Sequence, residues 1–135
     1  MFEKLDWKWI SLGVLIMVAL NVAAAFIIGL LLGPQLRGAT SIEDLNLTNT
    51  QILLALLVNT LSFLIGGFIV GVRSAGRTIL EPGISALVAV LILLLVSRQL
   101  SVTSMVAGGL VPFAAAVIGG WLGERRQAAG AQGRN

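Results

Sequence analysis

The sequence predicts an all-α integral membrane protein in which four transmembrane helices form an antiparallel bundle. The chain is 57% hydrophobic and only 11% charged, whereas about a quarter of the residues of a soluble domain are charged. The charged residues also leave four long uncharged stretches. A helix needs about 20 apolar residues to cross a hydrocarbon core ~30 Å thick, so each stretch reads as one span.

The first two predicted spans cover residues 10–32 and 51–72. The alanines at 23–25 resemble the cleavage site of a signal peptide. The first apolar run continues past them and is long enough to cross a bilayer. This length favours an uncleaved helix over a signal peptide. Gly33 and Pro34 end the helix, and a polar connection leads to the second span.

The third and fourth predicted spans cover residues 79–96 and 102–122. Thr78 and Glu81 have the spacing of a capping box, so we expect Thr78 to be the N-cap and Glu81 to occupy the third helical position. Pro82 then falls in the first turn, where a missing N–H costs nothing. Pro112 lies near the middle of the fourth span and predicts a kink there.

These spans divide the chain into a membrane domain, residues 1–123, and a short basic tail, residues 124–135. The tail is polar and rich in small residues, so it cannot bury enough apolar surface to fold alone. We therefore expect it to be mobile.

The distribution of lysine and arginine predicts the orientation. With four spans, one side of the membrane holds seven of the nine basic residues and the other side holds Arg37 and Arg98. The positive-inside rule makes the richer side cytoplasmic, so both termini are expected there. We expect a multipass protein of the bacterial inner (plasma) membrane.

Because the basic residues flank apolar spans and do not interleave with aromatic residues, the expected partner is the lipid bilayer and not nucleic acid.

Small residues recur at every fourth position in several spans, which predicts helix faces for close packing. Such a face could pack against another helix of the same chain, or against a second copy or a larger membrane complex. The predicted helix-packing residues are Gly29, Gly66, Gly67, Gly71, Gly108, Ala116 and Gly120.

Asn21 and Asn59 are the amide side chains well inside the spans, and both lie about 20 Å of helix from the cytoplasmic charges at 1.5 Å per residue. Pro112 lies at a similar depth. These three residues predict a polar layer in the middle of the membrane. The layer could be structural, with hydrogen bonds between helices, or it could be part of a conduction path.

The absence of cysteine, histidine and tyrosine excludes thiolate metal sites, imidazole acid/base chemistry and phenolic catalysts. All six acidic residues fall at predicted membrane edges, where solvation is their default role. We therefore expect no catalytic residues, no metal and no cofactor. The leading hypothesis is a non-catalytic accessory or scaffold subunit that packs through its glycine-rich faces. The alternative is a small oligomeric channel or transporter lined by Asn21, Asn59, Thr60 and Ser62.

Overall fold

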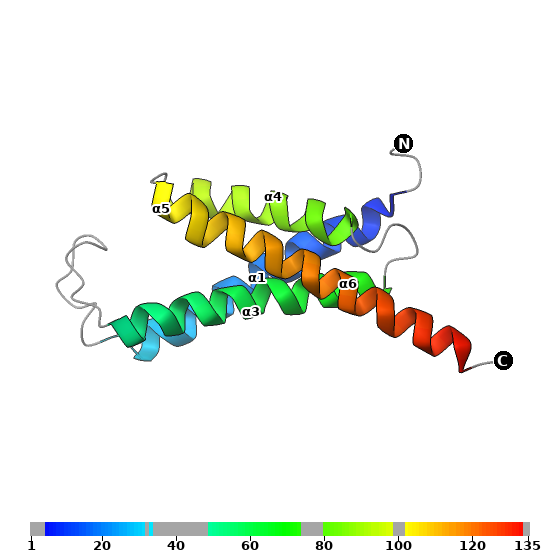
Figure 1. Cartoon of the computed structure of the whole chain (residues 1–135). Coiled ribbons are helices and arrows are strands. Elements are labelled where there is room, and N and C mark those ends of the chain that lie inside the picture. The colour runs from blue at the N-terminus through cyan, green and yellow to red at the C-terminus, as the bar shows by residue number, and fades with distance from the viewer. Residues whose placement is uncertain (1–4, 32, 34–48, 74–79, 99–101, 134–135) are drawn as a thin grey trace.

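The structure is a computed structural model that describes residues 5–31, 33, 49–73, 80–98 and 102–133. Its elements are α1 (Trp7–Leu31), α3 (Asn49–Arg73), α4 (Leu80–Ser97), α5 (Val102–Met105), the π-helix η3 (Val106–Leu110) and α6 (Val111–Gln132). Since α5, η3 and α6 follow one another without a break, they form a single continuous helix (Figure 1). The described chain is therefore built from four helical rods, one in each predicted span, and the predicted fold class is confirmed.

Three of these helices are long and apolar enough to cross a membrane: Trp7–Leu31, Asn49–Arg73 and Val106–Gln132. The fourth, α4, has 18 residues and is apolar but shorter. At 1.5 Å per residue α4 is about 27 Å long, close to the ~30 Å of a hydrocarbon core. The chain is thus an all-α membrane protein.

The four rods are arranged as two hairpins, one of α1 with α3 and one of α4 with α5–α6 (Figure 1). The starts of α1 and α4 and the ends of α3 and α6 lie together; we call this the basal end of the bundle. The hairpins cross near the basal end and diverge towards the opposite end (Figure 1). Both ends of the described chain are at the basal end, as expected for four spans.

The hydrophobic core lies where the two hairpins cross, and all four rods contribute to it. Partly buried aliphatic side chains and Phe113 pack around it. Many of its members are small, which lets the helix backbones approach closely. The buried core residues are Met17, Phe63, Ala86, Ala89, Val90, Ala115 and Ala116.

The fourth rod, formed by α5, η3 and α6, is distorted next to Pro112, which is fully buried. Immediately before it, η3 widens the helix, and the Val111 N–H donates to the carbonyl of Val106, five residues back. A proline in an α-helix removes one hydrogen bond and clashes with the carbonyl four residues earlier. A π-helical turn relieves that clash, so the expected distortion takes the form of a π segment.

The C-terminal part of the chain is helical further than the predicted span. Helix α6 continues to Gln132, ten residues beyond the predicted end at 122. Residues 124–132 are therefore a helical extension of α6, and the predicted mobility of this basic tail stays a prediction.

Candidate functional site

The closest contact between helices joins α3 to α6 through glycine. A Cβ placed on Gly67 would overlap the carbonyl oxygen of Ala116 and lie 2.8 Å from its Cα, and a Cβ on Gly71 would meet Gly120 in the same way. The two helices therefore touch backbone to backbone. This distance also permits weak Cα–H···O contacts across the interface.

A second row of glycines on α6 faces α3 as well. A Cβ on Gly119 would overlap the carbonyl oxygen of Leu64, and a Cβ on Gly123 would lie 2.7 Å from the carbonyl oxygen of Phe68. In both rows the residue numbers rise together, which means that α3 and α6 run parallel. Two small rows of α6 thus surround one ridge of α3.

The packing of α1 depends on two further glycines. Met17 of α1 lies over Gly66, with its Cγ 2.5 Å from where a Cβ would be. A Cβ on Gly13 would lie 2.6 Å from both the Ser85 hydroxyl and the Val70 side chain, so α1, α3 and α4 meet at Gly13. The spacing of small residues did not predict Gly13 as a packing residue, because the residues four positions away, Trp9 and Met17, are large.

Two of the predicted packing residues have no such neighbour. Gly29 on α1 and Gly108 in η3 have no heavy atom within 4 Å of their Cβ positions among the residues that the structure describes. Both lie away from the crossing, where the hairpins have diverged. The chain therefore uses Gly66, Gly67 and Gly71 internally and leaves Gly29 and Gly108 open.

Glu81 is fully buried at the basal end. Its Oε1 accepts a hydrogen bond of 2.6 Å from the backbone N–H of Asp6, which precedes α1. Asp6 in turn accepts a bond of 3.3 Å from the N–H of Trp9, so Asp6 caps α1. Glu81 is also the second residue of α4. Its carboxylate is thus close to the N-termini of two helices, whose partial positive charge favours an anion.

Ser85, one turn after Glu81, also connects α4 to α1. Its buried hydroxyl lies 2.8 Å from the Glu81 carbonyl oxygen and 3.0 Å from the Ile10 carbonyl oxygen, and it donates towards both. Glu81 and Ser85 together place the start of α4 against the start of α1. Thr78 lies outside the described residues, so its predicted role as N-cap stays a prediction.

The residues of the predicted polar layer are not joined by hydrogen bonds in the described part of the chain. The Asn21 amide donates to the Met17 carbonyl of its own helix at 3.2 Å. Asn59 is half-buried, and no hydrogen bond of its side chain to another described residue is seen. Pro112 packs in the interior and is fully buried. The hydrogen bonds between helices that a structural layer would need are therefore not among the described contacts.

Two other residues of the hypothetical channel lining are on α3. The Ser62 hydroxyl is buried and donates to the Val58 carbonyl at 2.9 Å within its own helix. Thr60 is half-buried. A hydroxyl bonded to the carbonyl four residues earlier is satisfied without water or a ligand.

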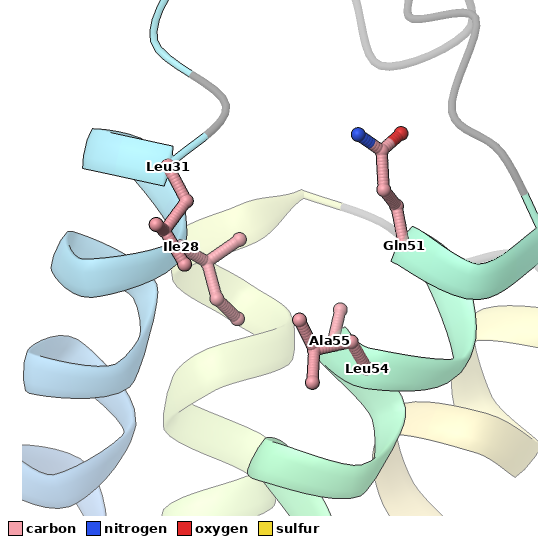
Figure 2. A pocket seen from close by; sticks show the side chains of 5 residues that line it. All are labelled: Ile28, Leu31, Gln51, Leu54 and Ala55. Carbon is pink, nitrogen blue, oxygen red and sulfur yellow. The ribbon is translucent and has the colours of Figure 1, made fainter.

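Three cavities lined by described residues are apolar. A space of about 30 Å³ lies between α1 and α3 at the end opposite the basal end, lined by Ile28, Leu31, Gln51, Leu54 and Ala55. Figure 2 shows the Gln51 amide turned away from the aliphatic side chains, so the lining of this space is apolar although it includes Gln51.

Larger open grooves of about 350 and 390 Å³ run along α4 and α6 and share Leu87 and Phe113. Their linings are aliphatic and aromatic side chains together with glycine.

Among the described residues, no group of three or more His, Cys, Asp or Glu side chains could hold a metal ion. The chain matches none of the protein-family models, curated proteins or solved structures with which it was compared. Its own geometry is therefore the basis for inferring its function, and the main feature of that geometry is close helix packing at glycines.

Proposed function

We propose that the protein is a non-catalytic accessory or scaffold subunit of the bacterial inner membrane, which packs through small-residue helix faces against itself or a larger membrane complex. The observation that carries this proposal is the division among its glycines. Gly67, Gly71 and Gly119 have neighbours so close that no side chain would fit, whereas Gly29 and Gly108 have none.

The open glycines have an energetic cost that a partner would offset. Glycine inside a helix destabilises it by roughly 0.5–1 kcal/mol relative to alanine. In lipid, where apolar side chains gain little from association, close backbone approach is what glycine offers in return. Ala25 lies four residues before Gly29 on the same face of α1 and is exposed. The face is therefore small, apolar and open, as a helix of a partner requires.

Cross-linking in native membranes, followed by purification in mild detergent, tests the proposal. Gly29→Leu covers the open face with an apolar side chain that lipid tolerates, so it should reduce cross-linked oligomers or copurifying partners. Ala23→Leu is the matched control, because Ala23 is exposed on α1 about 120° around the helix from Gly29. A parent protein that is strictly monomeric without copurifying proteins would contradict the proposal.

The second candidate is a small oligomeric channel or transporter lined by Asn21, Asn59, Thr60 and Ser62. The observation that favours it is Asn59, a half-buried amide on the part of α3 that lies beyond the crossing. The bonds of Asn21 and Ser62 within their own helices make it the weaker candidate.

A liposome flux assay across common ions separates the two candidates. For a channel, Asn59→Leu should block flux and leave the fold intact. For a scaffold, no flux is expected from correctly inserted protein, and Asn59→Leu should change stability alone.

A further inference from the structure

Among the described residues of the basal end, the basic side chains are exposed and the acidic ones are wholly or partly buried. Glu81 is fully buried against Asp6, and Asp6 caps α1. Glu124 is half-buried. The surface that the described residues present at this end is therefore positively charged, and its exposed cations are Lys8, Arg73, Arg125 and Arg126.

The packing of α6 on α3 brings together the chain segments that carry three of these cations. The Gln127 side-chain amide donates to the Val72 carbonyl, which holds the extension of α6 across the end of α3. Arg73 is the next residue after Val72, and Arg126 precedes Gln127. The guanidinium of Arg125 lies 3.9 Å from the centroid of the Trp121 ring, a cation–π contact that fixes its position.

The place of Trp121 indicates where this surface lies in a bilayer. Trp121 is 41% exposed and lies near the end of the apolar part of α6, three residues before Glu124. Tryptophan at such a position lies at the level of the lipid headgroups. Arg125 is one turn further along, about 6 Å at 1.5 Å per residue, and so reaches the phosphate layer. A guanidinium binds a phosphate through two parallel hydrogen bonds.

We propose that Arg73, Arg125 and Arg126 form a binding surface for the headgroup of an anionic phospholipid, such as phosphatidylglycerol. The occupant is a lipid and not a soluble anion, because the cations follow the apolar parts of two membrane helices, and Arg125 contacts an interfacial tryptophan. The proposal is independent of whether the protein assembles with a partner.

Trp121 itself can report the binding. In a Trp7→Phe, Trp9→Phe background, fluorescence quenching by brominated phosphatidylglycerol is compared with quenching by brominated phosphatidylcholine. Stronger quenching by the anionic lipid is expected. An arginine near an anionic membrane surface is worth about fivefold in affinity, so Arg125→Gln with Arg126→Gln should lower the preference by up to about 25-fold. Charge-retaining lysine replacements should preserve most of it.

Arg98→Gln is the matched control, because Arg98 is an exposed arginine at the opposite end of α4. It should leave the preference unchanged. Equal quenching of the parent by both lipids would overturn the proposal, and so would an equal loss in Arg98→Gln. Competition by millimolar inorganic phosphate would also overturn it, since that result would indicate a general anion site. Circular dichroism of each variant confirms that the helices are intact.

Discussion

At the scale of single residues, Glu81 shows how a buried acid can stabilise a membrane protein. Its carboxylate accepts the N–H of Asp6 and lies near the N-termini of α1 and α4. Acidic residues inside a membrane domain are costly and are usually functional. Here the two helix ends supply partial positive charge, which gives Glu81 a structural role in positioning α4 on α1.

Replacing Glu81 should therefore reduce stability. Glu81→Leu removes the carboxylate that accepts the Asp6 N–H, and leaves that N–H without this acceptor. We expect the free energy of unfolding to fall by about 1.5–3 kcal/mol. Glu81→Gln keeps an acceptor oxygen and should cost less. Reversible unfolding in mixed detergent micelles measures the free energy of unfolding, with Glu124→Gln as the control at a half-buried acid.

A functional role for Glu81 predicts a different result. If Glu81→Gln abolished a measured transport activity and left the free energy of unfolding unchanged, the structural interpretation would be wrong.

The sequence predicts Glu81 as a capping residue, and it gives no sign of the contact with Asp6. A capping box is a local pattern, and its spacing can be read from four consecutive residues. Asp6 is 75 residues away from Glu81. No local pattern carries information about that distance, because the contact exists only once α1 and α4 lie side by side. The same limit applies to Ser85 and the carbonyl of Ile10.

At the scale of elements, the spacing of glycine predicted that α3 and α6 are packing helices, while their pairing came from the structure. Hydropathy and charge place the helices along the chain, since both are properties of single segments. Gly67 and Gly71 could equally have faced α1, or a second copy. The register with Ala116 and Gly120 depends on the shape of both surfaces.

Replacing a glycine with alanine should lower the free energy of unfolding where the glycine contacts another helix, and should not lower it where the glycine has no neighbour. Gly67→Ala places a Cβ against the backbone of Ala116, which cannot move without separating the helices. We expect a loss of at least about 2 kcal/mol in the free energy of unfolding. Gly29→Ala makes the same chemical change where nothing lies within 4 Å, and should be neutral or stabilising by up to about 1 kcal/mol.

Unfolding of both variants under identical detergent conditions is the measurement. Equal effects of the two substitutions would show that α3 and α6 do not meet at Gly67.

At the scale of the whole molecule, charge distinguishes the two ends of the bundle. The basal end carries exposed Lys8, Arg73, Arg125 and Arg126, and Arg98 is the exposed cation at the other end of the described chain. The difference was predictable from the sequence, because it depends only on counting charges beside the spans. The polar layer was not predictable in the same way, since equal depth does not bring side chains into contact.

The predicted topology can be measured directly. Reporter fusions after Asn135 and after Ser41 should give opposite locations, with the fusion at Asn135 cytoplasmic. Equal activity of a cytoplasmic reporter at both positions would indicate that the chain inserts in both orientations.

The parallel contact of α3 with α6 has a consequence for synthesis. About 50 residues separate Gly67 from Ala116, so at roughly 5–20 residues per second the ribosome needs several seconds to make the second helix after the first. During that time the α1–α3 hairpin is in the membrane with the glycine face of α3 uncovered. Until the last helix arrives, that face is exposed to any other helix in the bilayer, including the same face of a neighbouring nascent chain.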